Sequence, residues 1–317
     1  MTTNPRTDQS NTGVLPEGGA QPESRSPVLT EAPPPRHGPW HALWRFARRK
    51  PMGVVGAVIV CLLVVVAVFA DQIAQHNPDR VRAVQRFLAP GSAFWFGTDD
   101  FGRDVFSRVV HGARISLRLG IFAVALGTSL GATVGMISGY LGGRIDLVIQ
   151  RGMDALMAFP TLVLALAVVT ALGASLHNVI VAVAITLIPA SNRVVRSVAL
   201  SVRETTYVDA ARALGGSQRR VVFVHVLPNC FAPYVVIATA NLGTAILAEA
   251  SLSFLGLGVP PPTPAWGSML SGASQNYLFR APWMAIYPGA AISLAVFGFN
   301  MLGDAIRDVL DPRLRGR

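Results

Sequence analysis

Long apolar runs separated by short polar stretches dominate this chain. Most of the runs are long enough to cross the hydrocarbon core of a bilayer as a helix, which takes about 20 residues at ~1.5 Å per residue. They lie at Met52–Ala70, Ile115–Ile137, Ala155–Leu172, Val179–Ala190, Phe231–Leu252 and Met284–Met301. The pattern predicts an all-α protein, a polytopic membrane helix bundle of about six transmembrane helices.

Glycines recur along the second run at nearly regular intervals. Gly120, Gly127, Gly131 and Gly135 are mostly four residues apart, which places them on one face of a helix. Small residues on one face let a neighbouring helix approach closely. We therefore expect this face to be buried against another helix rather than exposed to lipid.

The same pattern divides the chain into three parts. Residues 1–38 are rich in Pro, Gly, Ser, Thr and Gln without apolar periodicity, which predicts a disordered cytoplasmic tail. Residues 39–114 contain aromatic and basic side chains suited to lipid headgroups, then the first transmembrane helix and a polar external loop. Residues 115–317 form the core, which a polar segment interrupts at about 200–229.

Composition supports a membrane protein and argues against nucleic acid as a partner. The chain is 51% hydrophobic and only 14% charged, with a mean hydropathy of +0.46. Its formal net charge is +10, but the arginines lie at the ends of apolar runs rather than on one aromatic-rich face. We therefore interpret the positions of the arginines as a signal for how the chain is oriented in a bilayer.

Arginine-rich connections occur at Arg144 and Arg151, at Arg193 to Arg220, and at the C-terminus. The connections at the opposite ends of the runs, 173–178 and 256–283, contain a single arginine, Arg280. Because positive loops stay inside, both termini and the polar segment are expected in the cytoplasm. The first external loop also contains arginines, which we expect to pair with its aspartates, Asp79, Asp99, Asp100 and Asp104.

The polar segment from Glu204 to Pro228 predicts a helical hairpin outside the bilayer. Apolar positions recur at helical spacing up to Gly215, resume after it, and are expected to end at Pro228. Small Ala210 and Ala211 let another surface approach the backbone, and three arginines, Arg212, Arg219 and Arg220, give that approach a positive rim. The alternative is an ordinary amphipathic surface helix with a glycine at its C-terminus.

The order of residues in this hairpin resembles the EAA loop of ABC-importer permeases, which inserts into a groove of the ATPase subunit. The residues that carry the resemblance are Asp209, Ala210, Ala211, Arg212, Gly215, Leu227 and Pro228. The family pattern begins with Glu where this chain has Asp209, and His225 occupies a position where Ile is usual. The spacing is intact.

Two further stretches resemble permeases of the dipeptide, oligopeptide and nickel group. The first stretch runs from Phe96 to Arg108 and has Gly-Thr-Asp near its start. Because this stretch lacks the spacing of oxygen ligands found in a calcium loop, a structural role is favoured over a metal or phosphate site. The second runs from Glu249 to Gly267, where the prolines suit an extended external loop with Trp266 near the membrane interface.

Glu249 and Asn241 are candidate residues of a translocation path, because polar groups inside a membrane are costly and face protein or water. For Glu249 the alternative is a buried carboxylate satisfied by nearby hydroxyls such as Ser251 and Ser253, and this alternative is favoured. Asn241 is expected to form hydrogen bonds between helices instead. No catalytic residue and no metal ligand set is predicted.

The chain lacks the motifs of an ATPase. Lys50 is its only lysine and follows no glycine-rich loop, so it cannot supply the P-loop lysine. The six histidines are scattered and form no zinc motif, and no nucleophile turn is present, which disfavours an intramembrane enzyme. An ion-coupled secondary transporter remains as an alternative with Glu249 as its ion-coupling residue.

The resemblance implies a type I ABC-importer permease, a non-catalytic subunit of a bacterial inner-membrane transporter. Its implied partners are a second homologous permease, two cytoplasmic ATPases, an extracytoplasmic binding protein and membrane lipid. It further implies that this chain binds no cofactor, since ATP and Mg would be held by the ATPases. Di- or oligopeptides are the implied cargo, with glutathione-type peptides and nickel chelates as alternatives.

Overall fold

The computed structural model describes residues 51–310, apart from the side chains of 274–276. The predicted tail and the aromatic and basic stretch before Pro51 lie outside the described residues. In order, the helices are α2 Pro51–Val68, α3 Ala70–Ile73, α4 Val105–Leu141, α5 Gly143–Met157, α6 Thr161–Leu172, α7 Leu176–Arg203, α8 Thr206–Ala213, α9 Gln218–Val221, α10 Leu227–Phe254, α11 Trp266–Asn276 and α12 Trp283–Leu310. A 3-10 turn at Ala83–Gln85 and a π-helical turn at Val222–Val226 complete the described elements.

The predicted membrane bundle is confirmed. Within residues 51–310, five helices are long and apolar enough to cross a bilayer, and the bent pair α5 and α6 makes up to six. The expected run Ala155–Leu172 is not one straight helix, because α5 and α6 meet at an angle of 90°. Pro160 explains the break, since it disfavours helical backbone at the preceding residue. Arg144 and Arg151 are helical residues of α5, so their predicted loop is wrong.

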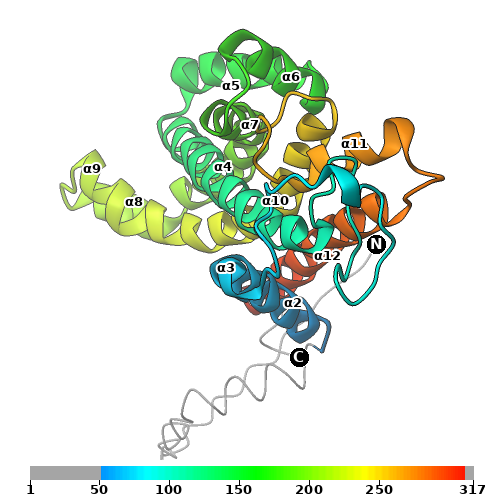
Figure 1. Ribbon diagram of the computed structural model, residues 1–317. Coiled ribbons are helices and arrows are strands. Elements are labelled where there is room, and N and C mark those ends of the chain that lie inside the picture. The colour runs from blue at the N-terminus through cyan, green and yellow to red at the C-terminus, as the bar shows by residue number, and fades with distance from the viewer. Residues whose placement is uncertain (1–50, 311–317) are drawn as a thin grey trace, which may run out of the picture. The chain divides into compact units, whose positions relative to one another are not determined.

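Glycines join α4 to α7 at the centre of the bundle (Figure 1). A methyl group added at Gly127, Gly131 or Gly135 would overlap backbone of α7, at Ala184, Ile188 and Asn192 respectively. Gly120 instead faces Ile246 of α10. The glycine face is therefore buried as predicted, and the two helices touch backbone to backbone.

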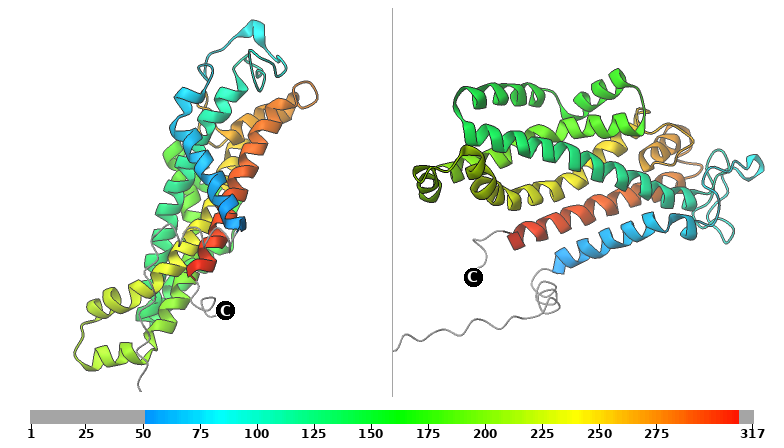
Figure 2. Two further views of the ribbon diagram at one scale, coloured as in Figure 1. Left: turned by 90° about the horizontal axis from the view of Figure 1, so that it is seen from below. Right: turned by 90° about the vertical axis from the view of Figure 1, so that its left-hand side faces the viewer.

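The first helix packs on the last. α2 is apolar on all sides and much of it is exposed in the described chain, as suits a helix in contact with lipid. Its contact with α12 is formed by two glycines, Gly56 and Gly298, and a Cβ at Gly298 would be 2.6 Å from Ile59 Cγ2. Figure 2 shows α2 alongside α12, on the face of the bundle opposite α5 and α6.

The two ends of the bundle differ. α8 and α9 project from one end, whereas residues 70–104, α11 and the loop before it gather at the other (Figure 2). Trp266 opens α11 and is buried, donating a hydrogen bond from Nε1 to the Val109 carbonyl oxygen at 2.9 Å. Trp266 therefore packs inside the protein, where Gly112 leaves room for its ring.

Candidate functional site

The predicted helical hairpin is formed by α8, residues 214–217 and α9. Gly215 has φ of +79°, a conformation that glycine adopts at little cost. The Gly215 amide donates to the Arg212 carbonyl at 2.9 Å and the Gly216 amide to the Ala211 carbonyl at 3.0 Å. These two bonds form a Schellman motif, which ends α8 and satisfies its last carbonyl groups. Ser217 then caps α9 by accepting from the Arg220 amide.

Two valines attach the hairpin to the bundle. Val208 of α8 and Val221 of α9 are buried in a cluster with Met136 and Tyr140 of α4 and with residues of α7. The opposite side of the hairpin is exposed, and Leu214 at its tip has 89% of its surface accessible. An apolar tip held on a fixed base is the geometry of a docking element.

The two alanines of the predicted docking surface lie on different sides of α8. Ala210 is exposed, whereas Ala211 is half-buried against the cluster that contains Val208. Close approach to the backbone is therefore open at Ala210. The exposed residues of α8 are Thr206, Tyr207, Asp209, Ala210, Arg212 and Ala213. Ala211 instead helps to seat the hairpin on its own bundle.

The positive charge of the hairpin is distributed unevenly between α8 and α9. Arg212 pairs with Asp209 at 3.2 Å, and its guanidinium lies 5.4 Å from the centre of the Tyr140 ring. Within residues 51–310, no acidic side chain pairs with Arg219 or Arg220, and both are exposed. The net positive charge predicted for the rim therefore rests on α9 rather than on α8.

Pro228 does not end the second helix as predicted. The chain continues from α9 through the π-helical turn into α10, so Leu227 and Pro228 form its first turn. The Leu227 amide bonds to the Val222 carbonyl, one residue further back than in an α-helix. This wider turn accommodates a proline, which has no amide hydrogen and would clash with the preceding turn of a regular helix. Motion of the hairpin can thus pass directly into α10.

Asn229 provides a second link between the hairpin and α10. Its Nδ2 donates to the Tyr207 hydroxyl of α8 at 3.2 Å and to the His225 carbonyl at 2.6 Å. The Tyr207 and His225 rings lie 5.8 Å apart. His225, which occupies the position where the EAA pattern has Ile, thus contacts α8 of the same chain.

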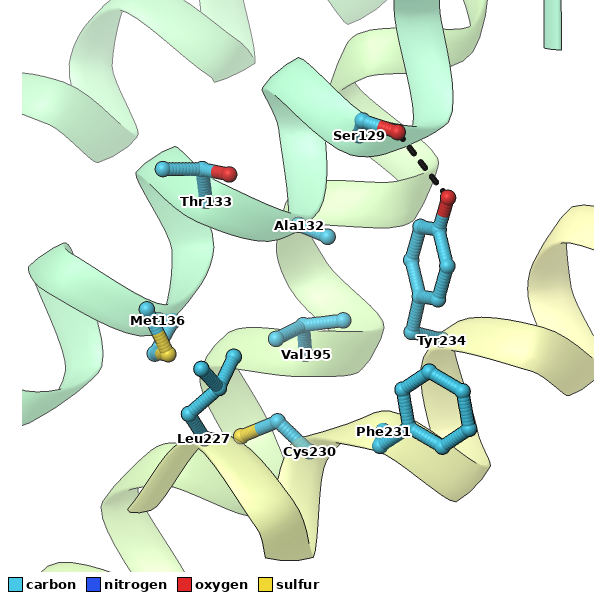
Figure 3. Close-up of a pocket in the computed structure, with 9 residues that line it drawn as sticks. All are labelled: Ser129, Ala132, Thr133, Met136, Val195, Leu227, Cys230, Phe231 and Tyr234. Atoms are coloured by element: carbon cyan, nitrogen blue, oxygen red, sulfur yellow. Dashed lines mark hydrogen bonds between the residues drawn. The ribbon is translucent and has the colours of Figure 1, made fainter. Parts of the chain in front are cut away.

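A cavity of about 200 Å³ lies behind the first turns of α10 (Figure 3). Its walls are mainly apolar and include Met136 of α4 and Cys230 of α10. At one end the Tyr234 and Ser129 hydroxyls are 2.9 Å apart and form a hydrogen bond. The cavity leaves this part of α10 with fewer packing contacts than a filled core would supply.

Glu249 is completely buried between α10 and α4, with an exposed fraction of 0%. It accepts hydrogen bonds from Ser253 Oγ at 2.7 Å and from Ser116 Oγ at 3.1 Å. Ser251 is not a partner, because its hydroxyl donates to the Leu247 carbonyl. The expectation of a carboxylate satisfied by hydroxyls is confirmed, with Ser116 from another helix in place of Ser251.

Asn241 is also buried and joins three helices. Its Nδ2 donates to Thr128 Oγ1 of α4 at 3.0 Å and to Ser191 Oγ of α7 at 3.2 Å. This confirms the expected hydrogen bonds between helices. Both residues hold neighbouring helices together through these hydrogen bonds in this conformation.

The segment between α3 and α4 contains the expected ion pairs in part. Arg103 lies 2.7 Å from Asp99, and buried Arg108 lies 3.5 Å from Asp79 and 3.8 Å from Asp99. Asp104 is not paired with an arginine, because it caps α4 by accepting from the Ser107 amide at 3.1 Å. These contacts support the structural role predicted for this stretch.

Asp71 ties α3 to α4. Arg114 Nη2 and His111 Nε2 each lie 3.1 Å from one of its carboxylate oxygens. These hydrogen bonds lower the pKa of the Asp71 carboxyl below its usual value. The carboxylate therefore stays ionised at neutral pH and holds the end of the first span against α4.

Nearly the whole sequence is similar to known proteins. Residues 131–316 match the family described as binding-protein-dependent transport system inner membrane component, and residues 38–90 match the N-terminal TM domain of oligopeptide transport permease C. The chain is 42% identical over 301 residues to the dipeptide transport system permease protein DppC of Alkalihalophilus pseudofirmus, covering 92% of this chain and 99% of that protein. It is 45% identical over 279 residues to the glutathione transport system permease protein GsiD of Escherichia coli, covering 88% and 92%.

Proposed function

This chain belongs to the family of binding-protein-dependent transport system inner membrane components, the permeases of ABC importers, and we propose that it conducts di- or oligopeptides into the cell. The similarity to both a dipeptide and a glutathione permease supports this cargo, since both names denote short peptides. A nickel chelate remains a second candidate, because the external stretches resemble a group that includes nickel permeases.

We further propose that the hairpin binds one of two cytoplasmic ATPases, and that these ATPases hold the ATP and Mg that the transporter uses. The observation that carries this proposal is the hairpin itself, an exposed apolar tip on a base fixed by Val208 and Val221. The chain has no lysine available for a P-loop, so ATP must be bound elsewhere. A second permease and an extracytoplasmic binding protein would complete the assembly.

The mechanism follows from how the hairpin is connected. α7 leads into α8 through Glu204 and Thr205, and α9 leads into α10 through the π-helical turn. A pull on α8 therefore acts on the ends of two spans at once. ATP-driven closure of the ATPases would rock α7 and α10 together, and this motion would alternate the path between inward and outward openings.

Energy coupling tests the proposed function. Uptake of a labelled dipeptide into cells that express the whole transporter should stop when ATP is depleted, even if the proton gradient is maintained. Glu249→Gln should retain most of the uptake, because the amide oxygen can still accept from one serine hydroxyl while the amide nitrogen donates to the other. Uptake that follows the gradient and fails in Glu249→Gln would instead identify a secondary transporter.

Cysteine labelling tests the proposed orientation of the chain in the membrane. Leu214 at the hairpin tip and Phe279 in the connection between α11 and α12 are both highly exposed. In a chain lacking Cys61 and Cys230, Phe279→Cys should react with an impermeant thiol reagent in intact cells, whereas Leu214→Cys should react only after the membrane is opened. Labelling of both positions from the same side would contradict the cytoplasmic hairpin.

A further inference from the structure

A cleft of about 740 Å³ lies between α7, α10 and α12, in the half of these helices nearest the hairpin. Apolar side chains form two of its walls, with Val194 and Val198 from α7 and Val236 and Ile237 from α10. The volume is within the range of about 300–1,000 Å³ that is usual for small-molecule sites. A short peptide fits this space.

The third wall of the cleft is charged. Asp304 and Arg307 of α12 line it and are exposed. They are three residues apart, so they share one face of the helix with their Cβ atoms ~5–6 Å apart. Among the described residues, neither side chain forms an ion pair or a hydrogen bond, whereas Arg193 and Arg196 of α7 are both paired with aspartates of α5.

Glu249 and Asn241 lie within an apolar span, where burial and hydrogen bonds compensate their polar groups. Asp304 and Arg307 follow the apolar run Met284–Met301 and lie in the last two turns of α12. Among the described residues they have no such partners, so their charges are available to an ionic ligand in the cleft. The cleft is also connected to the hairpin, because Asn229 lines it and bonds to Tyr207.

We infer that this cleft is the inward-facing part of the translocation path and that Asp304 and Arg307 bind the two ends of a short zwitterionic peptide. The carboxylate of Asp304 is suited to the terminal ammonium group, and the guanidinium of Arg307 forms paired hydrogen bonds with a terminal carboxylate. Two extended residues span about 7 Å at ~3.3–3.6 Å each. This length is similar to the ~5–6 Å expected between the Cβ atoms of Asp304 and Arg307. The valine and isoleucine walls accept varied apolar side chains without strict selection.

This inference rests on the proposed peptide cargo, and the test separates the two. The assembled transporter is reconstituted with its binding protein, and ATP-driven uptake is measured for a dipeptide with free ends and for the same dipeptide amidated at its C-terminus. Arg307→Gln should lower uptake of the free dipeptide about tenfold or more, since a hydrogen bond to a charged group contributes ~1.5–3 kcal/mol. It should leave uptake of the amidated dipeptide nearly unchanged. Asp304→Asn should behave in the same way towards free and N-acetylated dipeptides.

Arg144→Gln is the matched control, because Arg144 is an exposed arginine of α5 that does not line the cleft. It should leave uptake of both peptides unchanged. Equal losses for free and capped peptides, or no loss in either cleft variant, would overturn the inference while leaving the peptide permease intact. Absence of ATP-driven peptide uptake by the wild-type transporter would instead remove the proposed function and the inference together.

Discussion

An Ala210→Glu permease should reach the membrane in normal amounts and lose its ATPase subunits on purification. Ala210 lies on the exposed side of α8, where a closely approaching partner has no room for a longer side chain. An unpaired carboxylate trapped in such a contact costs several kcal/mol. A loss of about 3 kcal/mol would weaken ATPase binding roughly 100-fold. The measurement is co-purification of the ATPases at equal membrane abundance, together with ATP-driven uptake.

Two companion variants separate docking from folding of the hairpin. Ala210→Ser keeps the side chain small and should retain both the ATPases and uptake. Ala211→Glu is less informative, because it puts a charge against the chain's own cluster around Val208 and disturbs the hairpin itself. Full recovery of ATPases and uptake in Ala210→Glu would show that α8 is an ordinary surface helix, since glutamate is nearly as good a helix former as alanine.

Gly131→Leu should prevent the bundle from assembling. Even a single methyl group at Gly131 would overlap the Ile188 carbonyl oxygen and come within 2.9 Å of Ser191 Cβ, and neither backbone can yield without separating α4 from α7. Overpacking in a tight core costs ~1–3 kcal/mol and more where backbone is the obstacle. We expect the purified chain to aggregate or to unfold at a clearly lower temperature, as followed by gel filtration and thermal unfolding in detergent.

Gly152→Leu is the matched control for that prediction. Gly152 is also a helical glycine, in α5, but no atom outside the local helix lies within 4 Å of a Cβ added there. Leucine should be tolerated at Gly152 and add up to about 1 kcal/mol of helix stability. If both leucine variants behave alike, the close contact between α4 and α7 does not hold the bundle together.

Features of the fold that depend on local sequence were predictable. Apolar runs located the spans, and the glycine spacing identified the buried face of α4. Gly215 indicated the end of α8, because a Schellman motif needs left-handed backbone at that position. In each case the signal and the structure that it specifies lie within a few turns of each other.

Features that depend on contacts between distant segments were missed. Ser116 is far from Glu249 in sequence, and only the packing of α4 on α10 brings the two together. The packing of the Trp266 ring on Gly112 likewise depends on the contact between α11 and α4, which are far apart in sequence. The predicted helix end at Pro228 was wrong for a different reason. The wider π-helical turn that accommodates this proline has no recognisable sequence pattern. The break between α5 and α6 does have a local signal in Pro160, because the residue before a proline disfavours helical backbone.

The glycine contacts limit how this transporter can open. Two helices that meet backbone to backbone have no layer of side chains between them that could shear, so α4 and α7 should travel as one rigid body. α2 and α12 are also closely packed at Gly56, where an added Cβ would lie 2.7 Å from the Leu302 backbone nitrogen, so we expect them to move together as well. Relative motion is then concentrated between the pair α4 and α7 and the pair α2 and α12, which face each other across α10. Asp304 and Arg307 belong to α12, whereas Val194 and Val198 on the facing wall belong to α7. A peptide bound between them would be released by the separation of its own two walls.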